Sequence, residues 1–219
     1  MIKKLLTTTF VALCSMLSFS SCAASSSDSN TNTNQKTENM KTEGKKLVVF
    51  FSHTGENYNV GYIEKGNTHI IADMIADATG ADRFEIIPEK EYPKDDYNEC
   101  IEIAKKEKQS NARPAIKGDV NIEGYDIIFL GYPNWWGEVP MCVYTFIEKH
   151  DWDGKTVIPF ITHEGSGMGG TDRKIANACK GADVAVGKGL AVQGKVAQEN
   201  QATAKKNVNN WLEGLGFKH

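Results

Sequence analysis

The chain has 219 residues, with 25 Lys and Arg against 28 Asp and Glu, and a formal net charge of −3 at pH 7. This length allows one good-sized domain. A nucleic-acid partner would require a basic face, so the mildly acidic balance argues against such a partner. The sequence contains neither Cys-x-x-Cys nor His-x-x-x-His, and we therefore expect no structural metal site.

The first 21 residues are typical of an exported bacterial protein. Lys3 and Lys4 supply a positive start, and residues 5–17 are mostly apolar but too short and interrupted to predict a membrane span. Ser20 and Ser21 precede Cys22, which resembles a bacterial lipoprotein cleavage site and implies a lipid on Cys22. An ordinary secretory signal cut nearby is the alternative. The expected location is the bacterial cell envelope, lipid-anchored and extracytoplasmic.

Three parts are predicted along the chain: a signal peptide at 1–21, the lipidated Cys22 with a flexible tether at 22–45, and a folded domain at 46–219. The tether is rich in Ser, Asn, Thr, Gln and Lys, and such a segment buries too little apolar surface to offset its ordering entropy. In the domain, Cys142 and Cys179 fall in apolar helical patterns, which predicts small buried side chains.

Strands and helices are predicted to alternate through the domain. Residues 46–51 (KLVVFF) form a continuous apolar run, as in a strand buried on both faces. Further strands are predicted at 83–87, 126–131, 156–162 and 183–192, the last one broken, and helices at 68–79, 97–108, 139–149, 171–179 and 197–212. This order indicates right-handed βαβ units and a parallel sheet covered on both faces. Pro159 argues against a regular fourth strand, because proline has no backbone N–H to donate to a neighbouring strand.

The loops after the first, third and fourth strands are the candidate ligand site, since ligands bind at the carboxyl ends of such strands. After the first strand, Ser52, Thr54 and Gly55 suit a backbone that curls around a small anion. Thr68, at the predicted helix start, could serve as the N-cap or as a phosphate donor. A polar turn followed by an ordinary cap is the structural alternative.

The loop after the third strand, residues 131–140 (GYPNWWGEVP), contains two adjacent tryptophans. Stacking on a flat aromatic ligand would explain Trp135 and Trp136, although one of them could pack under the neighbouring helix.

The loop after the fourth strand is rich in glycines, which allow close backbone approach to a ligand. Gly165, Gly167 and Gly170 match the G-x-G-x-x-G pattern of dinucleotide-binding proteins. That pattern belongs in the first βα turn, with an acidic residue about twenty positions on. Here the pattern lies in the fourth βα unit and lacks that acidic residue. We therefore interpret these glycines as part of the rim of the ligand site, where backbone N–H groups can donate.

The S-x-T-G, P-x-W-W-G and T-x-x-G-S-G loops, in this order, resemble those of flavodoxins, and especially the bacterial flavodoxin-like proteins that carry WWG. The resemblance spans the domain from its first strand to its last helix. It implies a flavodoxin-like three-layer α/β/α sandwich with a five-stranded parallel sheet of order 2-1-3-4-5. It also implies FMN as cofactor and electron transfer to a redox partner protein or a small quinone-like acceptor.

The resemblance also assigns site residues. The phosphate would be bound by Ser52, His53, Thr54, Gly55, Asn67 and Thr68. One side of the flavin ring would be lined by Pro133, Asn134, Trp135, Trp136 and Gly137. The other edge would be wrapped by Thr162, His163, Glu164, Gly165, Ser166 and Gly167. Residues 57–65 are an insertion into the usual phosphate loop, and they leave open whether Asn57 or Thr68 completes the phosphate site.

Three functions remain open. The first is an electron carrier with no dedicated catalytic residue. The second is an FMN-dependent NAD(P)H quinone or nitro reductase, although no region dedicated to a nicotinamide nucleotide is evident. The third is a non-catalytic module that binds another small ligand and has lost flavin. His53 is expected to contribute its backbone N–H rather than to act as an acid or base.

Overall fold

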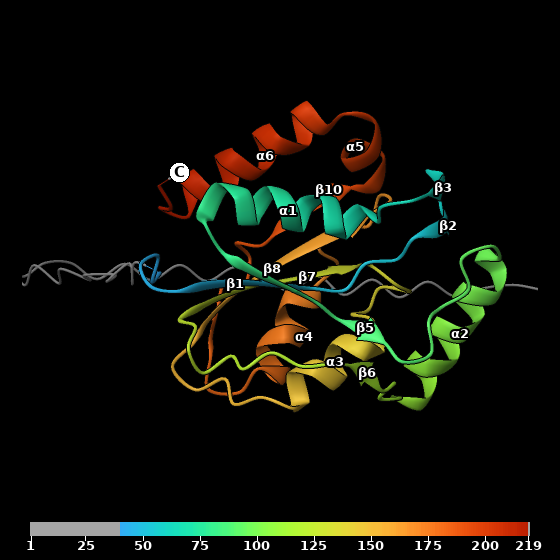
Figure 1. Ribbon diagram of the computed structural model, residues 1–219, viewed down its shortest axis with the longest axis horizontal. Helices are drawn as coiled ribbons and strands as arrows, with labels where there is room; N and C mark the ends of the chain where they lie inside the picture. The colour runs from blue at the N-terminus through green and yellow to red at the C-terminus, as the bar shows by residue number, and fades with distance from the viewer. Residues whose placement is uncertain (1–39, 219) are drawn as a thin grey trace, which may run out of the picture. The chain divides into compact units, whose positions relative to one another are not determined.

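The computed structural model describes residues 40–218, and its centre is one parallel sheet (Figure 1). The predicted signal peptide, Cys22 and residues 22–39 of the predicted tether lie outside the described residues. The neighbouring strands, from one edge to the other, are β4 (Asp82–Glu85), β1 (Lys46–Phe50), β7 (Ile127–Pro133), β8 (Thr156–His163) and β10 (Leu190–Gln193). In chain order of the five main strands this is 2-1-3-4-5, so the predicted order is confirmed.

Strand β1 shows why the sheet is buried on both faces. The side chains of Leu47 and Val49 pack into one apolar cluster, whereas those of Val48 and Phe50 pack into a second. All four are buried. Successive side chains of a strand point to opposite faces, so a continuous apolar run supplies both layers at once.

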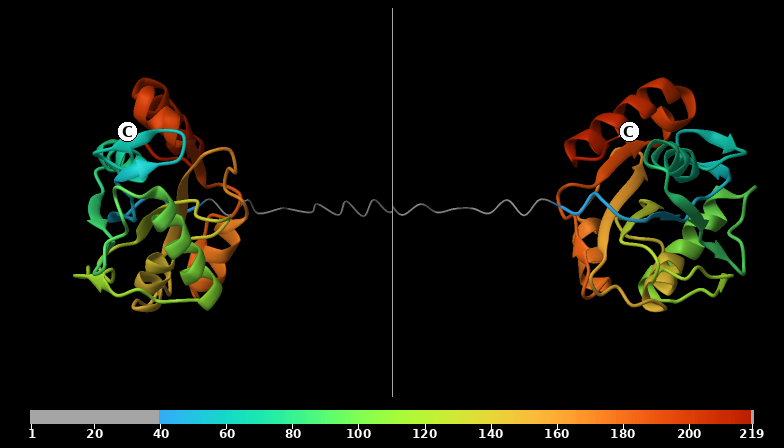
Figure 2. Two further views of the ribbon diagram at one scale, coloured as in Figure 1. Left: turned by 90° about the vertical axis from the view of Figure 1, so that its right-hand side faces the viewer. Right: turned by 60° about the vertical axis from the view of Figure 1, so that its left-hand side comes forward.

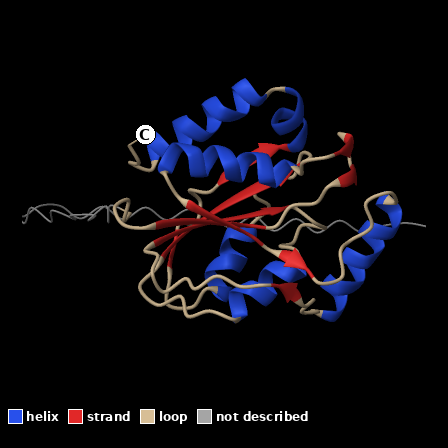
Figure 3. Ribbon diagram, viewed as in Figure 1, coloured by secondary structure: helices blue, strands red, loops and turns tan. Residues whose placement is uncertain are grey.

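Helices cover both faces of the sheet and complete three layers (Figures 1 and 2). One face carries α1 (Asn67–Thr79), α5 (Gly194–Glu199) and α6 (Gln201–Gly214). The other carries α2 (Tyr97–Ser110), α3 (Met141–Glu148) and α4 (Thr171–Ala178). The colouring by secondary structure in Figure 3 shows the strands between these two groups of helices. Within residues 40–218, no helix combines the length and the apolar character needed to cross a membrane.

The last strand is in two pieces, and Pro159 explains the break. The backbone N–H of Asp183 donates to the Lys155 carbonyl at 2.8 Å, and that of Ala185 donates to the Val157 carbonyl at 2.9 Å. Pro159 is the next residue of β8 to face this side, and it has no N–H to contribute. The pairing stops there: β9 (Asp183–Val184) lies before the gap and β10 lies after it. The prediction of a broken final strand is thus confirmed.

Two segments differ from their predictions. The predicted final helix at 197–212 is wrong as a single element, because Asn200 leaves helical geometry with φ −139° and separates α5 from α6. An antiparallel hairpin of β2 (Gly55–Asn57) and β3 (Gly61–Ile63) begins just before the insertion at 57–65 and ends within it. A second short pairing joins β5 (Ile87–Pro88) to β6 (Ile116–Lys117).

Candidate functional site

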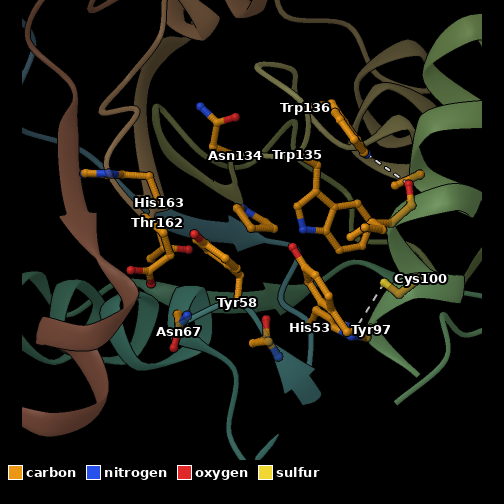
Figure 4. A pocket seen from close by; sticks show the side chains of 15 residues that line it. His53, Tyr58, Asn67, Tyr97, Cys100, Asn134, Trp135, Trp136, Thr162 and His163 are labelled. Atoms are coloured by element: carbon orange, nitrogen blue, oxygen red, sulfur yellow. Dashed lines mark hydrogen bonds between the residues drawn. The ribbon is translucent and has the colours of Figure 1, made fainter. Parts of the chain in front are cut away.

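A pocket lies at the carboxyl ends of β1, β7 and β8 (Figure 4). The residues after these strands line it together with the hairpin and α2. This is the edge at which open parallel sheets bind ligands. The structure brings together on its wall nine of the residues assigned from the sequence: His53, Asn67, Pro133, Asn134, Trp135, Trp136, Thr162, His163 and Glu164.

The loop after β1 is fixed by backbone contacts beside the pocket. Ser52 Oγ accepts a hydrogen bond from the backbone N–H of His69, in the first turn of α1, at 3.1 Å. Gly55 has φ +89°, and a Cβ at this position would lie 2.2 Å from the Lys94 carbonyl oxygen. Only glycine fits such a close approach. Ser52, Thr54 and Gly55 are therefore next to the pocket but are not part of its wall.

Thr68 has a different role from the predicted helix cap. The residue that caps α1 is Gly66, and Thr68 lies inside the first turn. Its Oγ1 is 2.7 Å from Thr162 Oγ1, and the residue is buried. The Thr68 hydroxyl thus joins α1 to β8 behind the pocket wall. Asn57, in contrast, lines the pocket.

The His53 side chain forms an uncharged part of the pocket wall. The residue is only 8% exposed, and its ring meets the Trp135 ring edge-on, with 5.8 Å between centroids. Its Nε2 lies 3.7 Å from Cys100 Sγ. Burial, with a smaller effect from the charge of Lys94, lowers the pKa of His53 to about 4. The imidazole is therefore neutral at pH 7 and cannot attract an anion by charge.

The two tryptophans have separate environments although both line the pocket. The Trp135 ring packs edge-on against Tyr92, at 4.8 Å between centroids, and against Phe51 at 5.3 Å. Trp136 is 47% exposed, and its indole N–H donates to the Ile101 carbonyl of α2 at 3.0 Å. Trp135 thus joins the core to the pocket, and Trp136 forms part of the pocket mouth.

The tryptophan loop is held in a tight turn. Trp135 and Glu138 exchange two backbone hydrogen bonds, of 3.1 and 3.0 Å. Trp136 and Gly137, between them, both have positive φ, at 58° and 67°. Positive φ is rare for a bulky side chain and marks a position that its surroundings hold in place. Here Lys108 Nζ donates to the Trp136 carbonyl at 2.6 Å. The loop is therefore preorganised.

The loop after β8 forms the opposite wall. The backbone N–H of Asn134 donates to the Thr162 carbonyl at 2.8 Å, which joins the two loops at their bases. Gly165 donates its N–H to His163 Nδ1 at 2.9 Å and has φ +116°. The wall ends at Glu164, so Gly165, Ser166 and Gly167 lie beyond it, as Gly137 does on the other side.

Two buried polar atoms of the wall lack partners. Asn134 Nδ2 and Glu164 Oε1 have no hydrogen bond within residues 40–218. Burial raises the pKa of the Glu164 carboxyl group. A buried polar atom without a partner is costly, so Asn134 Nδ2 indicates a ligand that supplies an acceptor. The Glu164 carboxyl group, in contrast, lies against the backbone of Gly194 and Lys195, which partly offsets the rise of its pKa.

The sequence reasoning missed the part of the wall contributed by α2 and the hairpin. These residues are Tyr58, Tyr97, Cys100, Ile101 and Ala104. Tyr97, Cys100, Ile101 and Ala104 follow the spacing i, i+3, i+4, i+7, which places them on one helix face. That stripe, in an otherwise charged helix, was the available signal. Tyr58 carries no such sequence signal, because it lies in the insertion at 57–65.

Known proteins resemble this chain in sequence and in fold. The flavodoxin family model matches residues 45–215. A protein from Bacteroides eggerthii assigned to the flavoproteins is 29% identical, with TM-score 0.62, covering 80% of this chain and 100% of its own. One from Bacteroides uniformis is also 29% identical, with TM-score 0.60 and coverages of 76% and 98%. A Lactobacillus acidophilus flavoprotein in complex with FMN shares the fold at 20% identity, TM-score 0.56 and coverages of 77% and 99%. No curated protein sequence gives a significant match.

Proposed function

The chain belongs to the flavodoxin family, and from this premise we propose that it is an FMN-binding electron-transfer protein, anchored to the bacterial envelope by a lipid on Cys22. One observation carries the proposal. The pocket at the carboxyl ends of β1, β7 and β8 combines aromatic walls with the amide donor of Asn134, which has no partner among the described residues. Bound FMN would supply the redox chemistry, and the protein would bind, orient and shield it.

The residues of the pocket fit the parts of FMN. The flavin ring is planar, and one edge carries carbonyl oxygens and an N–H group. Trp135 and Trp136 offer aromatic surface for the ring. Asn134 Nδ2 has no partner among the described residues and can donate to a carbonyl oxygen of the flavin. The amide of Asn134 thus matches the carbonyl oxygens of the flavin edge.

The phosphate would be held without ion pairs. No Lys or Arg is among the residues that line the described pocket, and its polar side chains near α1, Asn57 and Asn67, are uncharged. Asn67 Oδ1 accepts from Gln198 Nε2 at 2.8 Å, which orients the amide so that its N–H groups remain available. The N-terminus of α1, at Asn67, adds the favourable end of the helix dipole.

The FMN proposal is tested by titrating the purified full chain with FMN and with riboflavin. We expect one FMN per chain, with flavin fluorescence quenched by the tryptophans, and weaker binding of riboflavin, which lacks the phosphate. Trp136→Leu should weaken FMN binding about ten-fold, because it removes a stacking surface. Tyr62→Leu changes an exposed aromatic residue outside the pocket wall and should bind FMN normally. A chain that takes up neither compound would exclude the proposal.

The membrane anchor is tested separately in a bacterial host that processes lipoproteins. The Ser20-Ser21-Cys22 sequence supports the proposal. The wild-type protein should partition into the detergent phase of a Triton X-114 extract and should incorporate labelled fatty acid. Cys22→Ala should do neither, while its FMN affinity stays the same. Incorporation of label by the Cys22→Ala variant would contradict lipidation at this residue.

A further inference from the structure

One wall of the pocket has no role in the proposed flavin site. Tyr58 lies between β2 and β3, and Tyr97 is the first residue of α2. Their rings are stacked, with centroids 6.3 Å apart and planes inclined by 23°. Both side chains line the pocket (Figure 4). The pair therefore offers a second aromatic surface, separate from that of the tryptophans.

The two tyrosines are held in place by a link between their elements. The backbone N–H of Glu56, in β2, donates to the Lys94 carbonyl at 2.6 Å. The carboxylate of Glu56 in turn accepts from the backbone N–H of Tyr97 at 3.3 Å. The hairpin is thus fastened to the start of α2, and the rings keep their mutual position without a ligand. Such preorganisation lowers the entropic cost of binding.

The chemistry of this wall suits an uncharged, planar ligand with oxygen acceptors. Neither the Tyr58 nor the Tyr97 hydroxyl has a hydrogen-bond partner among the described residues, so both are free donors. Burial raises the pKa of Tyr97, which keeps its hydroxyl protonated. The neighbouring wall, from Cys100, Ile101 and Ala104, carries no charge. An ionic ligand would lose its hydration there without compensation.

We propose that Tyr58 and Tyr97 form the binding site for a quinone, which stacks on the ring pair and accepts hydrogen bonds from the two hydroxyls. This inference rests on the proposed function, because the electrons come from FMN in the same pocket. Bound FMN in its reduced form would supply the two electrons and two protons that convert the quinone into a hydroquinone, and it would be left oxidised. The tyrosines bind and orient the acceptor and give up no proton permanently.

The hairpin offers a matched pair of variants for the test. Tyr58 and Tyr62 are 58% and 56% exposed, but only Tyr58 lines the pocket. The FMN-loaded full chain is reduced anaerobically with dithionite and mixed with 2-methyl-1,4-naphthoquinone, and flavin reoxidation is followed against quinone concentration. Tyr58→Leu should raise the half-saturating concentration about five-fold, the loss expected for one stacking contact. Tyr62→Leu should stay within about two-fold of wild type, and Tyr58→Phe, which keeps the ring, should show a smaller rise.

Two controls separate acceptor binding from flavin binding. Ferricyanide accepts single electrons without an aromatic site, so its rate should be the same in wild type, Tyr58→Leu and Tyr62→Leu. The FMN dissociation constant of Tyr58→Leu should also equal that of wild type. A weakened FMN affinity would place Tyr58 in the flavin site and overturn the inference. Equal quinone effects in the two leucine variants, or none in either, would overturn it as well.

A measurement without flavin distinguishes failure of this inference from failure of the proposed function. The quinone should quench tryptophan fluorescence of the flavin-free protein, because Trp135 and Trp136 share the pocket with the tyrosines. The quenching should require higher quinone concentrations in Tyr58→Leu than in Tyr62→Leu. If FMN fails to bind while this difference is found, only the proposed function is excluded. If the two variants are quenched alike, the quinone site is excluded even where FMN binds.

Discussion

His53 shows how burial alone sets the chemistry of a single side chain in this pocket. Its ring is enclosed by Trp135, Tyr92 and Cys100, and no carboxylate of the described residues pairs with it. Burial and Lys94 both disfavour the imidazolium ion. The residue next to the proposed phosphate site is therefore neutral at physiological pH, and it begins to gain its charge only in strongly acidic solution.

The lowered pKa of His53 predicts a specific loss of stability in acid. Above about pH 6.5 the ring is neutral in both states and has no effect. Below that pH the unfolded chain binds a proton that the folded chain rejects until about pH 4, so stability falls as the pH falls through this range. Relative to His53→Gln, which does not titrate, the unfolding free energy of wild type should drop by up to about 3 kcal/mol.

Urea unfolding of wild type and His53→Gln at several pH values between about 7 and 4 would measure this difference. The comparison removes the contributions of Asp and Glu residues, which titrate alike in the two proteins. A constant difference across the range would show that the folded ring takes up its proton normally, and would contradict the burial described above.

The tryptophan pair shows how far residue-level prediction reached. The sequence identified Trp135 and Trp136 as ligand-facing, and the structure places both on the pocket wall. It could not say which one enters the core, because that depends on contacts from distant segments. Ile101 and Lys108 of α2 fix Trp136, and Tyr92 meets Trp135. None of these partners lies in the local sequence pattern.

At the scale of elements, the boundary between α5 and α6 depends on one cap. The Asn200 side chain accepts from the backbone N–H of Thr203 at 3.1 Å and so satisfies a donor at the start of α6. Asn200→Ala should lower the unfolding free energy by about 1 kcal/mol, whereas Asn200→Asp should retain most of it because aspartate caps equally well. Thermal or urea unfolding measures both; equal losses in the two variants would rule out the capping role.

The elements also show which parts of the fold the sequence could predict. The central strands β1, β7 and β8 follow from long apolar runs, and the order of the main strands follows from the flavodoxin resemblance. The hairpin of β2 and β3 could not be predicted, because its strands have three residues each and its position depends on the contact of Glu56 with Lys94. Tyr58 was missed for the same reason, whereas Tyr97 belongs to the stripe on α2 that the sequence does contain.

At the scale of the whole molecule, two apolar clusters on opposite faces of one sheet hold the described chain together. Met40 already packs against the cluster beneath α1 and α6, and the backbone N–H of Lys45 donates to Asp126 at 2.9 Å. The packing of the described region thus begins a few residues before the first strand.

This predicts the effect of two truncations. A chain that starts at residue 40 should have the same unfolding free energy as the full chain within about 0.5 kcal/mol. A chain that starts at residue 46 should lose about 1 kcal/mol, because Met40 and the contact of Lys45 are gone. Urea unfolding, fitted with one m-value for the three chains, measures both differences in unfolding free energy. A larger loss for the chain starting at 40 would mean that residues 1–39 contribute to stability.

The break opposite Pro159 has a further consequence for the behaviour of the protein in crowded surroundings. A long exposed sheet edge invites another chain to add a strand and begin aggregation. Here one edge is divided into β9 and β10, of two and four residues, and the other is β4, whose four residues include Asp82, Arg83 and Glu85. Neither edge presents a continuous apolar template, so we expect crowded copies of the protein not to pair their edge strands.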